Sequence, residues 1–179
     1  MNKFRNLIVL GPLVYLIHHF EEHIIFNFRE WRLSYFADNN TLSTEEVLIR
    51  LAVVLLIAIY IHLIKQNRAS AHVVLFFLMT TQVVNAFFHM FLSAYFADFS
   101  PGTITAILLY LPINYLILKA AFKEGFLQNY LELLILFIAG IFTFTMFEVI
   151  GPEVIGYSLL LTPFYYLLVN RLDRRGMSL

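Results

Sequence analysis

The chain of 179 residues contains no cysteine, which excludes a disulfide framework and thiolate chemistry. Charge is also scarce, because only 13% of the residues are charged and 12 basic residues balance 12 acidic ones. No basic tract stands out, which argues against nucleic acid as a partner. The first apolar stretch follows a basic N-terminus but has no small-residue cleavage site, so we expect it to be retained as a helix.

Apolar side chains dominate the composition. Hydrophobic residues make up 60% of the chain, with 19 Phe and 10 Tyr, and the mean hydropathy is +0.77. A soluble domain has only roughly 45–50% apolar residues. We therefore predict an all-α, polytopic integral membrane protein, in which residues 1–179 form a single transmembrane domain.

Six stretches come close to the roughly 20 apolar residues that a membrane-spanning helix needs. They are residues 6–27, 47–64, 71–96, 102–121, 129–149 and 153–170. We predict a bundle of six transmembrane helices, with five helices as the fallback. After the first stretch, Phe28, Trp31 and Tyr35 fall on one helical face, which predicts a short interfacial helix; an irregular aromatic loop is the alternative.

The distribution of basic residues favours the six-helix arrangement. With six spans, nine of these residues share one side: Lys3, Arg5, Lys65, Arg68, Lys119, Lys123, Arg171, Arg174 and Arg175. The other side holds only Arg29, Arg32 and Arg50. Because positive charge favours the cytoplasmic side, we predict a multi-pass protein of the plasma membrane with both termini in the cytoplasm.

The first apolar stretch contains five ionisable residues in six positions, His18-His19-Phe20-Glu21-Glu22-His23. Within a bilayer each costs ~2.5–3.5 kcal/mol on insertion scales, so the group needs partners, a metal or a wet cavity. On an α-helix, His18 faces the same way as Glu21 and Glu22, while His19 and His23 form a second pair. Imidazole beside carboxylate suits a divalent metal of the zinc or iron class, and it also suits proton relay.

Polar residues of other helices are expected at the same depth. Asn85 and His89 lie four residues apart in the outer half of the third predicted helix, and Gln82 lies one turn before them. Thr105 enters from the start of the fourth helix, and Arg50 lies near the outer end of the second. We predict that these side chains line one cavity around the His/Glu group.

Three short motifs resemble those of a known family. His18-x-x-Glu21-Glu22 is similar to the motif that names the HXXEE family of bacterial membrane proteins. Asn85-Ala86-x-x-His89 resembles the second motif of that family, and Pro101-Gly102-x-x-Thr105 resembles the third, in the same order. The resemblance covers about residues 10–120. It implies a membrane fold and a set of candidate residues, but no reaction.

The residues themselves suggest a reaction class. Two adjacent carboxylates in a low-dielectric site cannot both stay ionised without a cation. We therefore predict a divalent metal held by His18, Glu22 and His89, with Glu21 or Glu22 as the catalytic acid or base. The predicted function is a membrane-embedded, metal-dependent enzyme that acts on a lipid or another apolar substrate. A metal-free isomerase that shuttles protons is a variant of this prediction.

Other interpretations of the same residues remain open. The group could be the proton or cation relay of a transporter, or a polar cluster that only holds helices together. The segment from His19 to His23 also matches the H-x-x-E-H zinc pattern, although both histidines could instead face the lipid interface. An apolar plug in the inner half would favour the enzyme, and a continuous polar path would favour transport.

The remaining ionisable residues of the apolar stretches are expected at helix ends. His62 and His72 are predicted at the cytoplasmic interface, and Glu132 is predicted to extend its side chain to the inner surface. Glu148 and Glu153 flank the turn between the last two helices and are expected to be solvated. No chemistry is assigned to any of them.

Overall fold

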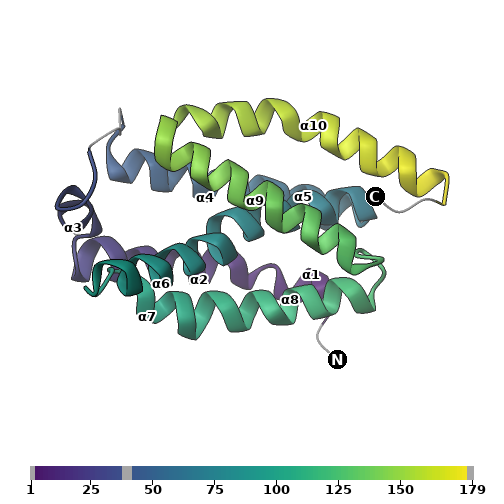
Figure 1. Cartoon of the computed structure of the whole chain (residues 1–179). Helices are drawn as coiled ribbons and strands as arrows, with labels where there is room; N and C mark the ends of the chain where they lie inside the picture. The colour runs from purple at the N-terminus through teal and green to yellow at the C-terminus, as the bar shows by residue number, and fades with distance from the viewer. Residues whose placement is uncertain (1–2, 38–41, 177–179) are drawn as a thin grey trace.

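The computed structural model describes residues 3–37 and 42–176, and this part of the chain contains helices but no strand. The all-α class is therefore as predicted. The helices run back and forth along one common axis, and the described chain begins and ends at the same end of the bundle (Figure 1). We call the end with the two described chain ends the inner end, and the opposite end, where α3 lies, the outer end.

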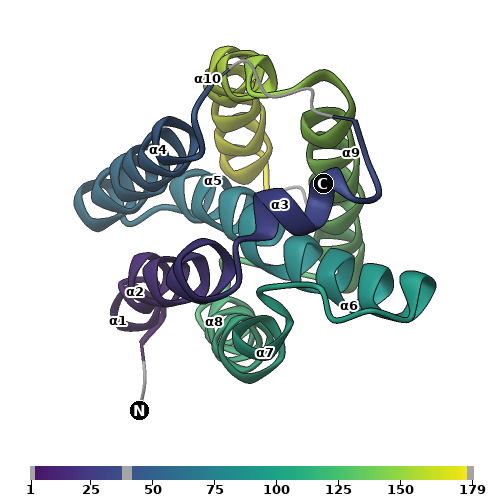
Figure 2. The same ribbon diagram turned by 90° about the vertical axis from the view of Figure 1, so that its left-hand side faces the viewer.

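The first pass along the bundle is broken into short pieces. It consists of α1 (Phe4–Leu7), α2 (Leu10–His19) and the π-helical turn η1 (Phe20–Ile25). The predicted short helix follows as α3 (Phe28–Leu33), and it begins where Asn27 takes a left-handed conformation, with φ 49°, and caps the backbone N–H of Glu30. Its place across the outer end is visible in Figure 2.

The other helices begin at recognisable capping residues. Ser43 and Glu46 form a capping box at the start of α4 (Thr44–Lys65). Asn67 caps α5 (Arg68–Leu78), and Asn129 caps α9 (Tyr130–Ile150). The remaining elements are η2 (Met79–Val84), α6 (Asn85–Phe96), α7 (Thr103–Thr105), η3 (Ala106–Tyr110), α8 (Leu111–Lys123) and α10 (Glu153–Arg174).

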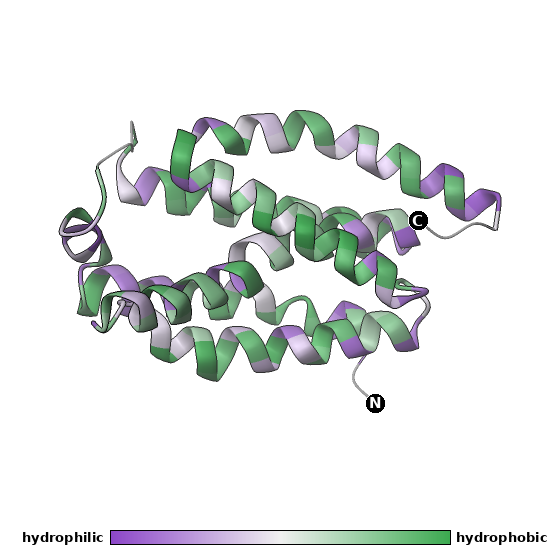
Figure 3. Cartoon of the chain, in the orientation of Figure 1, coloured by the Kyte–Doolittle hydropathy of each residue, from purple (hydrophilic) through white to green (hydrophobic). Residues whose placement is uncertain are grey.

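Four helical segments of the described chain are long and apolar enough to cross a membrane: Thr44–Lys65, Arg68–Phe96, Thr103–Lys123 and Tyr130–Ile150. They correspond to the second to fifth predicted spans. The first predicted span is helical but interrupted between α1 and α2, and the last forms α10, which has Pro163 inside it. Hydrophobic residues follow the lengths of the helices, whereas hydrophilic residues gather mostly near the two ends of the bundle (Figure 3).

The pass formed by α5, η2 and α6 is the most buried of the four segments. It runs through the middle of the bundle, and α4, α8, α9 and α10 pack around α5 (Figure 2). Apolar side chains such as Leu75, Leu78 and Ile117 form the main core, which lies toward the inner end. Polar residues on this central pass therefore face other helices and not lipid.

Candidate functional site

The His/Glu group of the first pass lies in and just before a π-helical turn. The backbone N–H of Phe26 bonds to the carbonyl of Glu21 at 3.1 Å, five residues earlier, where an α-helix would pair residues four apart. Glu21 and Glu22 are both buried in this turn. Because π-helical turns are frequent at functional sites, the local backbone agrees with the interpretation of the sequence.

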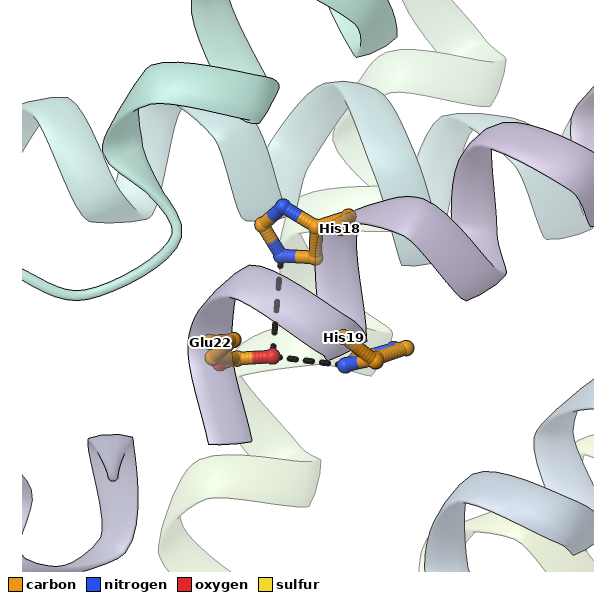
Figure 4. Close-up of side chains that lie close together, drawn as sticks. All are labelled: His18, His19 and Glu22. Carbon is orange, nitrogen blue, oxygen red and sulfur yellow. Dashed lines mark hydrogen bonds and ion pairs between the residues drawn. The ribbon is translucent and has the colours of Figure 1, made fainter. Parts of the chain in front are cut away.

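Glu22 is the centre of the group. Its Oε2 lies 2.6 Å from His19 Nδ1, 3.2 Å from His23 Nε2 and 3.6 Å from His18 Nε2. Its Oε1 lies 3.5 Å from Nε2 of His89, which comes from α6. Figure 4 shows the side chains of His18 and His19 directed at the carboxylate of Glu22. One buried carboxylate is thus surrounded by four imidazoles.

Glu21 has different partners. Its Oε2 accepts the backbone N–H of Thr105 at 2.7 Å, and its Oε1 accepts that of Ile104 at 3.2 Å. These N–H groups belong to the first turn of α7, where the preceding Gly102 has no side chain to act as a cap. The predicted stripe of two carboxylates around one cation is therefore divided, because Glu21 caps a helix and Glu22 faces the imidazoles.

Residues from α6, α7 and the loop between them hold the imidazoles in place. His18 Nδ1 lies 2.9 Å from Thr105 Oγ1, and His18 Nε2 lies 3.3 Å from Asn85 Nδ2. His89 Nδ1 lies 3.0 Å from the hydroxyl of Ser100. His18 and His89 are fully buried, with ring centroids 5.2 Å apart. The structure thus brings together the groups that the sequence predicts at one depth.

Gly102 lies against both of these imidazoles. A Cβ at this position would stand 2.8 Å from Cε1 of His18 and 3.1 Å from Cε1 of His89. The residue also has φ +95°, which favours glycine. The Pro-Gly motif therefore does more than start a helix, since it lets the backbone close over the site.

A cavity of about 150 Å³ opens beside Glu22. Its polar wall includes His19, His23 and Asn85, and its apolar wall is largely aromatic, with Phe77 and Phe88 among the lining residues. The side chains of the polar wall, together with hydroxyls such as those of Thr80 and Thr81, face aromatic rings in one small space. Such a mixed lining suits an amphipathic molecule.

Of the five side chains predicted around the His/Glu group, only Asn85 lines this cavity. Thr105 and His89 instead contact His18 and Glu22 behind its wall. Gln82 is fully buried against α2, where it donates to the carbonyl of Gly11 at 2.8 Å and accepts from Asn114 at 2.8 Å. Arg50 lies in a second hollow between α4 and α10. The physical reason is direction, since Leu48 and Leu51 face the cavity and residues one or two positions away on an α-helix point elsewhere.

The sequence does not indicate the ion pair at the far side of the cavity. Glu148 was expected to be solvated, but its Oε2 lies 3.3 Å from Nη2 of Arg32 and both side chains line the cavity. The distribution of basic residues predicts Arg32 at the outer end, but it does not predict an acidic partner for this arginine. The pair adds a charged part to the wall of the cavity.

A second buried polar cluster lies at the inner end. Arg68 pairs with Glu132, and His72 lies 2.9 Å from the hydroxyl of Tyr165 and 2.9 Å from the carbonyl of Phe126. Glu132 was expected to extend its side chain to the inner surface and His72 to lie at the interface, but both side chains are fully buried between helices. His62 is also buried, beside Ser70 at 2.9 Å. The reason is that α5 runs through the middle of the bundle, so its polar side chains meet α9 and α10.

The donor set around Glu22 fits a divalent metal. Ligand atoms of His18, His19 and Glu22 all lie within 4.8 Å of one another. Nε2 of His89 and Nε2 of His19 are buried nitrogens without a hydrogen-bond partner in the described structure. Buried imidazole nitrogens normally have a partner, and His/carboxylate sets suit zinc or iron. This group contains His19 beside the predicted ligands His18 and Glu22. The predicted ligand His89 is outside it, although its Nε2 lies 3.5 Å from Glu22 Oε1.

Residues 9–117 match the model of a family described as "Protein of unknown function with HXXEE motif". The chain belongs to the HXXEE family. The matched part of this HXXEE protein runs from just after α1 to the middle of α8, and it contains Glu22 and all four imidazoles around it. Helices α9 and α10 lie outside the match. Searches of curated proteins and of solved structures found no match for this HXXEE protein.

Proposed function

We propose that this HXXEE protein is a membrane-embedded, metal-dependent enzyme that acts on a lipid or another apolar substrate with a polar group. The observation that carries the proposal is the set of four imidazoles around the buried carboxylate of Glu22. Two of those imidazoles keep a buried nitrogen without a hydrogen bond within the described residues. A cluster that only held helices together would satisfy these atoms, because an unpaired buried polar atom is destabilising.

The proposed metal ligands are Glu22, His18 and His89, with His19 as a further candidate. A bound divalent ion of the zinc or iron class would supply a hydroxide from water at neutral pH or polarise a substrate oxygen. Thr105 and Ser100 orient the imidazoles of His18 and His89 through their other ring nitrogens.

Two residues have roles beside the ligands in this proposal. His23 lines the cavity and lies 3.2 Å from Glu22, so it is placed to move a proton between the carboxylate and a bound substrate. Glu21 is a positioning residue, because its carboxylate holds the first turn of α7 and thereby Thr105. Of the two predicted catalytic carboxylates, Glu22 is therefore the one that faces the chemistry.

The alternative of a proton- or cation-coupled transporter uses the same residues as a relay. Gln82 and Asn114 continue the polar groups inward, but they bond to each other and to backbone carbonyls. Further inward lie apolar side chains of the main core, including Leu75 and Ile117. This apolar plug supports the enzyme over the transporter.

The topology proposed with this function has six spans, both termini in the cytoplasm and the site in the outer half of the plasma membrane. The common position of the two described chain ends supports an even number of crossings (Figure 1). Reporter fusions after residues 68 and 125 should report the cytoplasm. An extracytoplasmic reporter at either position would contradict this topology.

The decisive experiment is elemental analysis of protein purified in detergent without chelator. We expect close to one zinc or iron per chain in the wild type, and clear loss of it in Glu22→Gln and His89→Ala. His62→Ala is the matched control, since His62 is equally buried but lies at the inner end. Metal at trace level in the wild type, unchanged by the three substitutions, would refute the metal-dependent proposal.

A further inference from the structure

A second hollow lies between α4 and α10, on the side of the bundle away from the His/Glu group. Its volume is about 620 Å³, within the range of roughly 300–1,000 Å³ found for small-molecule sites. Most of its lining is aliphatic, contributed by α4 residues such as Val53 and Ile57 and by α10 residues such as Leu159. We call this hollow the α4/α10 groove.

The groove adjoins the cavity beside Glu22. Phe77 of α5 and Ile155 of α10 line both hollows. A single layer of side chains therefore separates the groove from the cavity at this point. The half-buried Ile155 and the buried Phe77 are therefore the side chains that stand between a molecule in the groove and the polar wall.

The α10 side of the groove has free space. A Cβ added at Gly156 would meet no heavy atom within 4 Å, whereas a Cβ at Gly11 would stand 2.9 Å from a Leu78 side chain. Packing therefore explains the glycine at position 11 but not the one at position 156. The absence of a side chain at Gly156 leaves the groove open.

A cation marks the outer end of the groove. Arg50 lines it, is exposed, and lies six residues after the first residue of α4, Thr44. At 1.5 Å per residue, it lies about 9 Å along the helix, a depth from which an arginine side chain reaches the membrane surface. Glu153 lies at the same end of the groove. A cation above a long apolar surface complements a phosphate with an acyl chain below it.

We propose that the α4/α10 groove binds a membrane phospholipid, with its phosphate at Arg50 and one acyl chain between the two helices, and that lipids reach the cavity through it. The binding part of this inference is independent of chemistry at Glu22. The access part rests on the proposed function, because it names a bilayer phospholipid as the substrate class.

The test is photolabelling of the full chain in vesicles of phosphatidylglycerol that carry a diazirine on one acyl chain. Gly156→Trp fills the groove, and we expect it to remove most of the label from the groove-lining peptides of α4 and α10. Leu160→Trp is the matched control, since Leu160 is exposed on the same helix and does not line the groove. Val53→Trp fills the groove from α4 and should reduce the label as Gly156→Trp does. Agreement between the two variants would show that misfolding of one of them is not the cause of the loss.

The phosphate contact is tested by substituting Arg50. Arg50→Gln should weaken labelling about two- to fivefold, the range expected for loss of an exposed charge pair, and Arg50→Lys should retain most of it. Equal labelling of the groove peptides in wild type, Gly156→Trp, Val53→Trp and Arg50→Gln would overturn the inference.

Metal content of the same preparations separates this inference from the proposed function. Gly156→Trp and Arg50→Gln should keep the metal, while His89→Ala should lose it and keep the label. Groove labelling in a wild type without metal would refute the enzyme and leave phospholipid binding intact. Bound metal without labelling of the groove would refute phospholipid binding and leave the proposed enzyme intact.

Discussion

The two buried polar clusters, one at each end of the bundle, differ in how their imidazole nitrogens are paired. At the inner end, Arg68 neutralises Glu132, and each ring nitrogen of His72 has a protein oxygen 2.9 Å away. At the outer end, Glu22 meets four imidazoles, and Nε2 of both His19 and His89 lacks a hydrogen bond in the part of the chain described. Both clusters are buried, so it is the unpaired imidazole nitrogens that distinguish a candidate site from a structural link.

The clusters also differ in what they connect. The inner cluster joins α5 to α9 and α10, through Glu132 and Tyr165. The outer cluster joins η1 to α6, and it is covered by the loop at Gly102. We therefore expect substitutions in the inner cluster to act on stability, and substitutions in the outer cluster to act first on metal binding.

The largest expected effect is on stability at the inner end. Arg68→Ala leaves Glu132 buried without its cation, which should lower the free energy of unfolding by about 3–5 kcal/mol. Denaturant titration of the purified protein in detergent micelles measures it. Arg5→Ala is the control, because Arg5 is an exposed arginine near the same end. Equal stability of the two variants would remove the structural role of the inner cluster.

The next largest effect is the gain in stability when metal is added back to metal-free protein, and it should depend on the outer cluster but not on the inner one. A metal that binds only the folded wild type at 100 times its Kd stabilises it by about 2.7 kcal/mol. We expect this gain in wild type and in Arg68→Ala, measured as a shift of the unfolding midpoint after zinc is added to chelator-treated protein. His89→Ala should show no gain. A gain in His89→Ala equal to that of the wild type would contradict the ligand set.

Gly102→Ala should test the close approach of the backbone to the imidazoles. The positive φ alone costs about 1–2 kcal/mol with a Cβ, and forced overlap adds about 1–3 kcal/mol. Gly125→Ala is a matched control, since it has φ +76° and free space around its Cβ. Thermal unfolding should therefore show a greater loss for Gly102→Ala, together with weaker metal binding. Equal losses would mean that only backbone strain matters at Gly102.

The smallest expected effect concerns pH at the outer end, outside the four candidate spans. Hydrogen bonds from the Tyr35 hydroxyl and from Trp31 Nε1, at 2.8 and 2.7 Å, lower the pKa of Asp98. Because the folded pKa is the lower one, this contribution to stability is present above the unfolded pKa of about 3.9 and is lost as pH falls through the folded value.

Trp31 is the single tryptophan of the chain, so its fluorescence reports on this contact directly. In the wild type we expect the fluorescence of Trp31 to change as the pH falls below about 3.9, which is the usual pKa of Asp. The change should be absent in Asp98→Asn. The same transition in both proteins would show that Asp98 is not its origin.

Much of the fold follows from the sequence. The predicted spans 47–64 and 129–149 match α4 and α9 within a few residues at each end. Hydrophobic length and capping residues such as Ser43 and Asn129 determine these boundaries, and both are local properties. The convergence of His18 and His89 was also predictable, because helix direction and depth in the membrane follow from chain order.

The errors have more than one origin. Side-chain direction was predicted from ideal α-helical periodicity, but Glu21 and Gln82 lie in π-helical turns. Their directions therefore depart from the predicted face. The pairing of Arg68 with Glu132 needed the lateral order of helices, which no local pattern encodes. Sequence periodicity thus gives depth along the bundle well and orientation around each helix poorly.

The π-helical turns make the site sensitive to chain length. Successive residues of an α-helix are rotated by about 100°, whereas a π-helical turn uses about one more residue for the same rotation. A return of η2 to α-helical geometry with all its residues kept would therefore turn everything after it by roughly that angle. Asn85 and His89 follow η2 directly and would swing away from Glu22, although every residue of the site would still be present. Loss of one residue from η2 is therefore expected to leave Asn85 and His89 facing Glu22, whereas loss of one residue from the α-helical part of α5 should turn them away.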